Sequence, residues 1–193
     1  PARDLLAGSE LRQQRGYGGR LGNEGETIEA TWTPDGRGVV FAATVNRHEA
    51  ARAEVKVSLW HVLLEGGEPR RLTGEEGDYS APEFTRDGRV LLAKVQPTDQ
   101  RWVYTAARLV RWSWPSLDGR KVLTEGFEES VGQYVAAPDN RRAYFLAERA
   151  GHDKLFSVPL DGGEPKEVGT LRAGTYTRIA IGGSAGKPVM AAI

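Results

Sequence analysis

An internal repeat is the feature of this sequence that most restricts its fold. Three stretches align without gaps around an aspartate: TWTPDGRGVVFAA (31–43), EFTRDGRVLLAK (83–94) and VAAPDNRRAYFLAE (135–148). The intervals between these aspartates are equal, since 87 − 35 = 52 and 139 − 87 = 52. A second element follows each copy: SLWHVLLEGGEPRRLT (58–73), VRWSWPSLDGRKVLT (110–124) and KLFSVPLDGGEPKEVGT (154–170). A fixed period of this length indicates an array of similar supersecondary units.

Each repeat has the pattern of four antiparallel strands. A strand ends in a tight turn such as Pro-Asp-Gly, and an alternating strand follows it at once. An aromatic-bearing strand and a short strand complete the unit. Repeated units of four strands in about 50 residues are typical of β-propeller blades, with a coincidentally spaced β-sandwich as the alternative.

We therefore predict an all-β fold, a single partial β-propeller of four-stranded antiparallel blades, with about three and a half blades in the chain. The expected units are 1–26 (the end of a preceding blade and a long loop), 27–73, 79–124, 130–170, and 175–193 (the start of a further blade).

A possible nucleophile occurs near the end of the chain, where GGSAG (182–186) fits the G-x-S-x-G pattern of hydrolases. The same stretch also continues the repeat, with Ser184 in the place of Pro34. A hydrolase would need an Asp and a His later in the chain, but neither follows Gly186. We predict that Ser184 is a turn residue, not a nucleophile, and that the chain contains no catalytic residue.

The hairpin turns carry residue types that suit their backbone. Their last position holds a glycine or an asparagine, which tolerate positive φ, and the preceding aspartates can accept hydrogen bonds from turn N–H groups. The predicted structural turn residues are Asp35, Gly36, Asp87, Gly88, Asp139, Asn140 and Gly186.

Composition argues against several classes of function. The 26 Lys and Arg balance the 26 Asp and Glu, so net charge attracts neither nucleic acid nor an anionic membrane. No apolar run approaches the roughly 18 residues of a membrane span. With no cysteine and three histidines that lack metal-ligand spacing, we expect no metal and no cofactor. We expect a cytoplasmic location, with the periplasm as the alternative.

The repeat resembles the N-terminal propeller of the prolyl oligopeptidase family of serine peptidases, in particular its bacterial acylaminoacyl peptidases. The residues that carry the resemblance are Pro34-Asp35-Gly36-Arg37, NRHEAARAEVKVSLWHV (46–62), Gly66-Gly67-Glu68-Pro69 and Arg71-Leu72-Thr73. The opening ARDLLAGSE also resembles the last strand of a preceding blade in such enzymes, and the chain stops at the apolar run PVMAAI, so we expect a fragment of a longer protein. TolB-like periplasmic propellers share the turn motifs.

The resemblance implies a parent serine peptidase in which this non-catalytic propeller admits short peptides to an α/β-hydrolase domain of the same chain. No triad residue can be assigned here. The alternative is a non-enzymatic, TolB-like propeller that serves as a protein-binding scaffold. Exposed blade edges would also favour self-association.

In the dipeptidyl-peptidase relatives of this family, propeller glutamates hold the free amine of the substrate. The resemblance implies the same role for paired glutamates in two loops between blades, since a carboxylate pair suits an ammonium group. These substrate-gating candidates are Glu75, Glu76, Glu128 and Glu129, and solvated loop charge is the alternative interpretation. The Gly- and Arg-rich stretch 12–25 is expected to form a mobile loop. Trp60, Trp112 and Phe156 recur at one position of the repeat, which indicates packing between blades.

Overall fold

The computed structural model describes residues 2–22, 25–98, 105–168, 174–184 and 187–193. Gly186, one of the predicted turn residues, lies outside the described residues. The chain divides into two compact units, the first comprising residues 1–82 with 95–101 and the second comprising residues 83–94 with 102–193. None of the helices in the described part of the chain has the length and apolar character needed to cross a membrane.

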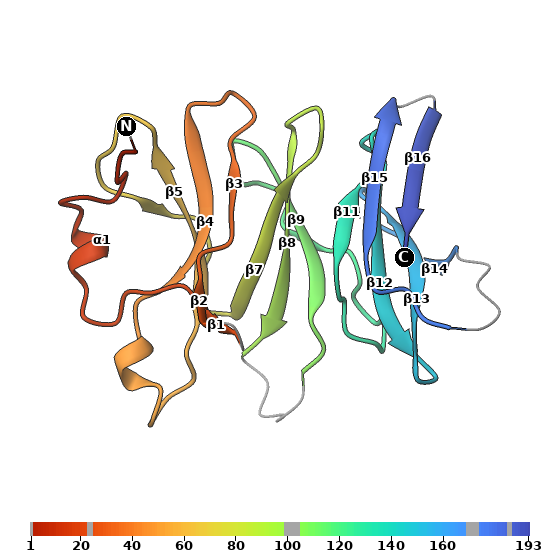
Figure 1. The fold of residues 1–193 in the computed structure, drawn as a ribbon, viewed down its shortest axis with the longest axis horizontal. Helices are drawn as coiled ribbons and strands as arrows, with labels where there is room; N and C mark the ends of the chain where they lie inside the picture. The colour runs from red at the N-terminus through yellow and green to blue at the C-terminus, as the bar shows by residue number, and fades with distance from the viewer. Residues whose placement is uncertain (1, 23–24, 99–104, 169–173, 185–186) are drawn as a thin grey trace. The chain divides into compact units, whose positions relative to one another are not determined.

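Strands dominate the structure, and they form three four-stranded antiparallel sheets in which neighbouring strands are consecutive in the chain (Figure 1). The first sheet comprises β3 (Ala30–Trp32), β4 (Gly38–Thr44), β5 (Val57–Leu63) and β6 (Arg70–Arg71). The second comprises β7 (Gly77–Phe84), β8 (Val90–Pro97), β9 (Arg108–Ser113) and β10 (Lys121–Val122). The third comprises β11 (Tyr134–Ala136), β12 (Arg142–Arg149), β13 (His152–Pro159) and β14 (Lys166–Glu167). The predicted four-stranded antiparallel sheets are thereby confirmed.

Two hairpins lie outside these sheets. One pairs β1 (Arg20–Gly22) with β2 (Gly25–Thr27), and the other pairs β15 (Ile179–Ser184) with β16 (Lys187–Ala192). The first hairpin overlaps the end of the stretch 12–25, which was expected to be a mobile loop. An ion pair of 2.7 Å between Arg47 Nη1 and Glu26 Oε2 ties it to a 3₁₀ turn at Arg47–Glu49. The 12–25 stretch is therefore partly ordered by pairing that its glycine content did not indicate.

The start of the chain also differs from the expectation. The opening stretch was expected to form a strand, but the structure has a turn there, followed by helix α1 (Glu10–Gln13). Gly8 has a φ of +82°, which ends any extended run, and the Ser9 hydroxyl caps the helix by accepting the Arg12 N–H at 3.2 Å. A local turn and cap thus replace the strand.

The turns that join the first two strands of each sheet share one geometry. In each, the aspartate Oδ1 accepts the N–H two residues further on, at 3.0 Å for Asp35, 3.1 Å for Asp87 and 2.9 Å for Asp139. The following residue has a positive φ: Gly36 +67°, Gly88 +70° and Asn140 +57°. Such a left-handed residue closes a tight hairpin, and glycine and asparagine adopt it at low cost.

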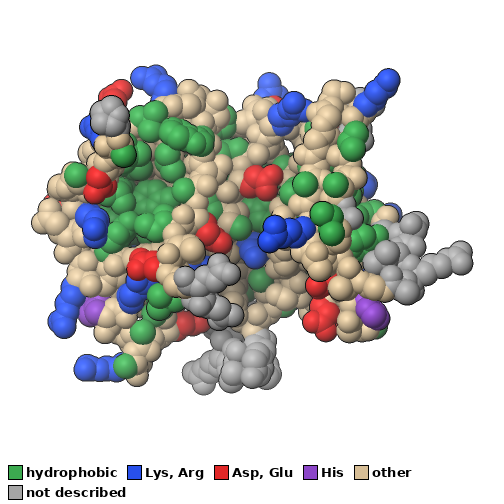
Figure 2. Space-filling model, in the orientation of Figure 1, with side chains coloured by type: hydrophobic (Ala, Val, Ile, Leu, Met, Phe, Trp, Pro, Cys, Tyr) green, Lys and Arg blue, Asp and Glu red, His purple; other side chains and the backbone are tan. Residues whose placement is uncertain are grey.

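In the first unit, β4 is buried on both of its faces. Side chains alternate along a strand, and Val40 and Ala42 on one face and Phe41 and Ala43 on the other are each at most 3% exposed. Figure 2 shows hydrophobic side chains gathered at the surface over this unit. Trp32 on β3 is 63% exposed. The strands of the first unit therefore leave apolar surface open to solvent.

In the second unit, an aromatic cluster joins β12 and β13. Phe145 and Phe156 stack at 5.5 Å between ring centroids, and Phe127 meets both rings edge-on. Phe156 is fully buried. The two tryptophans at the same repeat position are nearly so, with Trp60 9% and Trp112 5% exposed. These recurrent aromatic side chains belong to the interior, not to an open surface.

Candidate functional site

Ser184 is the last residue of β15, and it lies opposite Lys187 in the β15–β16 ladder. Its side chain is exposed. In the described part of the chain, no hydrogen bond joins its hydroxyl to a histidine or a carboxylate, and a nucleophilic serine requires such a base. The surroundings of Ser184 therefore provide no activation.

The first pair of gating candidates, Glu75 and Glu76, is engaged by neighbouring side chains. Glu75 Oε1 forms an ion pair of 3.3 Å with Arg71 Nη1, and Glu76 Oε1 accepts the Tyr79 hydroxyl at 2.5 Å. Both glutamates are exposed, and they point to local partners instead of sharing one. Each of these two carboxylates therefore bonds a different side chain in the structure.

The second pair, Glu128 and Glu129, divides in the same way. Glu129 Oε1 accepts a hydrogen bond from Arg149 Nε, and this bond, with the nearby positive charge, lowers the pKa of Glu129. The Arg149 guanidinium lies over the Phe156 ring, 4.6 Å from its centroid. Glu128 remains exposed. Glu129 thus anchors an arginine that covers the aromatic cluster.

A set of polar side chains that the sequence patterns did not single out connects the first strands of neighbouring sheets. In the first unit, Glu29 Oε2 accepts the Ala81 N–H at 2.7 Å. In the second unit, Gln133 accepts the Ile179 N–H at 2.9 Å and donates to the Ile179 carbonyl at 3.0 Å. Glu29 and Gln133 both precede their turn aspartate by six residues, since 35 − 29 = 6 and 139 − 133 = 6. A polar side chain at this repeat position was the available signal.

Glu83 forms a further connection of this kind, at a different repeat position. Its Oε1 accepts the Ala136 N–H of β11 at 2.9 Å. Burial raises the pKa of Glu83, and the Ala136 N–H lowers it by less. A partly buried carboxyl group of this kind is unusual away from a paired charge and is a candidate for function.

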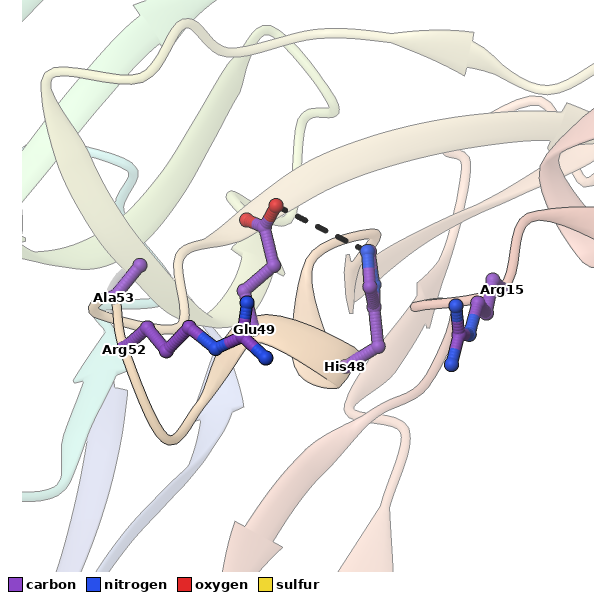
Figure 3. A pocket seen from close by; sticks show the side chains of 5 residues that line it. All are labelled: Arg15, His48, Glu49, Arg52 and Ala53. Atoms are coloured by element: carbon purple, nitrogen blue, oxygen red, sulfur yellow. Dashed lines mark ion pairs between the residues drawn. The ribbon is translucent and has the colours of Figure 1, made fainter.

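The first unit has a basic pocket of about 410 Å³ beside the 3₁₀ turn (Figure 3). It is lined by Arg15, His48, Glu49, Arg52 and Ala53. His48 Nε2 lies 3.9 Å from Glu49 Oε1, and in the described residues neither Arg15 nor Arg52 forms an ion pair. With two guanidinium groups against one carboxylate, this pocket is suited to an anionic group. None of the His, Asp and Glu side chains in the described ranges are grouped so that three could hold a metal ion.

Comparison with known proteins gives one match in sequence and several in structure. No protein-family model matches the chain. The chain is 28% identical over 150 residues to the Tol-Pal system protein TolB of Wolinella succinogenes. The match covers 73% of this chain and 32% of that TolB, so the chain spans about a third of the relative's length.

Two solved structures indicate the architecture. TolB from Acinetobacter baumannii matches with a TM-score of 0.57 and 16% identity, over 86% of this chain and 40% of that one. The fold is a partial β-propeller. A puromycin-hydrolyzing peptidase of Mycobacterium tuberculosis matches with a TM-score of 0.58 and 16% identity, over 74% of this chain and 22% of that one. The propeller fold is therefore shared with TolB proteins and with peptidases.

These comparisons refine two expectations from the sequence. The propeller resemblance to the prolyl oligopeptidase family is supported at the level of fold, but nothing in it singles out the acylaminoacyl peptidases. The match to TolB gives no support to the cytoplasmic location.

Proposed function

We propose that this chain is a non-catalytic propeller segment that binds other polypeptides, in the manner of a TolB-like scaffold. The observation that carries this proposal is the match to the Wolinella succinogenes TolB over 150 residues. The name of that protein assigns it to the Tol-Pal system, and from it we take only a role as a binding component of a larger system. A periplasmic location accompanies the TolB-like interpretation of the sequence.

The surfaces of the chain support a binding role. Among the described residues Ser184 has no hydrogen-bonded base, and the loop carboxylates Glu75, Glu76 and Glu129 are occupied by local partners. Exposed apolar side chains such as Trp32 and the basic pocket of the first unit are features by which a protein binds another chain.

A second candidate function is favoured by the likeness to the puromycin-hydrolyzing peptidase. In this case the chain would be the access-controlling propeller of a serine peptidase, with an α/β-hydrolase domain in the same parent chain and a short peptide as substrate. The four loop glutamates would then be the candidates for gating, and Glu75, Glu76 and Glu129 would have to exchange their local partners for the substrate.

The experiment that separates the two candidates uses the full-length gene product. Its coding DNA would be sequenced beyond residue 193, and the purified protein would be treated with a fluorophosphonate probe that labels activated serines. The TolB-like proposal predicts no labelling, no turnover of peptide anilides, and no hydrolase domain. A second G-x-S-x-G followed by Asp and His, together with covalent labelling, would contradict it and support the peptidase.

A further inference from the structure

The second unit contains a small pocket with Glu83 among its walls, which we name the Glu83 pocket. Its volume is about 250 Å³, and it is lined by Glu83, Phe84, Arg86, Pro138 and Ile181, with glycine backbone of β15. Phe84, Pro138 and Ile181 provide apolar walls, while Glu83 supplies a carboxylate. The pocket therefore combines hydrocarbon surface with a negative charge, in a volume suited to one side chain.

The carboxylate of Glu83 has room for a partner. Among the described residues, the Ala136 N–H is its one hydrogen-bond donor, and no lysine or arginine lies within ion-pair distance of it. Arg86 also lines the pocket, but its Nη1 donates to the Gly183 carbonyl at 2.5 Å. The guanidinium is thus bonded to the backbone of β15, and it forms no ion pair with Glu83.

The repeat does not explain why this residue is charged. Glu83 precedes its turn aspartate by four residues, since 87 − 83 = 4, and the corresponding residues of the other units are Thr31 and Val135. A neutral glutamine would accept the Ala136 N–H equally well, as Gln133 does for Ile179. A glutamine would also avoid the cost of placing a carboxylate away from water. The negative charge is consequently better explained by a ligand than by the scaffold.

We propose that the Glu83 pocket binds the side chain of a lysine from a polypeptide partner. The ammonium group would donate to the Glu83 carboxylate, and the methylene stem would lie against Phe84, Pro138 and Ile181. This inference rests on the proposed polypeptide-binding function, for which it names the side chain that is recognised.

The test is a calorimetric titration of the full-length protein with Nα-acetyl-lysine methylamide. Nα-acetyl-norleucine methylamide, which has no ammonium group, and alanine methylamide, which offers only an α-amine, serve as matched probes. The Glu83→Gln variant keeps an oxygen for the Ala136 N–H and removes the charge. Glu29→Gln is the control variant, because Glu29 also accepts a neighbouring N–H but does not line this pocket.

We expect the lysine probe to bind wild type and Glu29→Gln alike, and to bind Glu83→Gln about tenfold more weakly or worse. The norleucine probe should not bind. Affinity for the lysine probe should rise with pH as Glu83 ionises. At the lower pH values, where Glu83 is protonated, binding of the probe should release the Glu83 proton. Arg86 is the other ionisable side chain that lines the pocket in the described residues.

Equal affinity of wild type and Glu83→Gln for the lysine probe would overturn the proposal, and so would tighter binding of alanine methylamide. Absence of any lysine binding would overturn it as well. These results are separable from failure of the proposed function, which is decided by fluorophosphonate labelling and by the downstream coding sequence, not by this titration.

Discussion

Replacement of Phe156 by alanine tests whether the aromatic cluster holds the third sheet together. Phe156 is fully buried, and its ring centroid lies 5.1 Å from that of Phe127 and 5.5 Å from that of Phe145. Removing roughly 160 Å² of buried apolar surface at about 25 cal/mol per Å² costs about 4 kcal/mol. This value lies within the range of ~3–5 kcal/mol typical of Phe→Ala in protein cores. Part of the loss is the contact with the Arg149 guanidinium, 4.6 Å from the ring centroid.

Hydrogen–deuterium exchange measures this loss where it occurs. A decrease of about 4 kcal/mol corresponds to roughly thousandfold faster exchange of the most protected amides in the β12–β13 ladder. The β4–β5 ladder of the first unit is an internal reference in the same sample. Val168→Ala is the control, because Val168 is 42% exposed and its truncation should change stability by less than about 0.5 kcal/mol. An acceleration of less than tenfold in β12–β13 for Phe156→Ala would refute the reasoning.

Three further predictions concern single side chains. Gly36→Ala should lower the free energy of unfolding, measured in urea, by about 1–2 kcal/mol. The loss comes from the backbone alone, because φ is +67° and no atom lies within 4 Å of the added Cβ. An unchanged urea midpoint would contradict this. Since the hydrogen bond from Arg149 lowers the pKa of Glu129, the pair stabilises the fold above the unfolded-state pKa, and this contribution is lost as pH falls through the folded pKa. Arg149→Met should remove that acid-range decline, which is below about 1 kcal/mol for so exposed a pair, and urea titrations from pH 7 to pH 3 would detect it. Burial raises the pKa of Glu83, so wild type loses stability as pH rises through that pKa. The free energy of unfolding of Glu83→Gln should therefore exceed that of wild type near pH 7 but not near pH 4. An equal difference at both pH values would argue against a desolvated carboxyl group.

The four-stranded sheets could be predicted because their turns are encoded locally. Asp35, Asp87 and Asp139 each bond a backbone N–H two residues away, so the same short motif produces the same hairpin wherever it occurs. Equal spacing of these motifs then places the sheets in order along the chain. The opening turn and α1 could not be predicted in the same way, because Gly8 and Ser9 act once and belong to no repeat.

The candidate sites depended on information that is not local. The loop glutamates are pairs in the sequence, but their partners differ: Glu75 and Glu76 bond side chains a few residues away, whereas Glu129 bonds Arg149, which only the fold brings near. Glu29 and Gln133 could have been found, because both occupy the same polar position of the repeat. The Glu83 pocket could not, since Phe84, Pro138 and Ile181 come from three different strands or turns and meet only after the sheets form.

The residues that carry the resemblance to known propellers are the ones least able to distinguish their functions. Gly66 and Gly67 have φ values of +89° and +107°, which side-chain-bearing residues rarely adopt, so backbone geometry alone accounts for them. Gly36 follows the same rule. Any propeller with these hairpins has reason to use such residues, whether it is a scaffold or a peptidase cover. Functional information must therefore reside where the chain departs from its own repeat, and Glu83, a charge at a position that is otherwise threonine or valine, is such a departure.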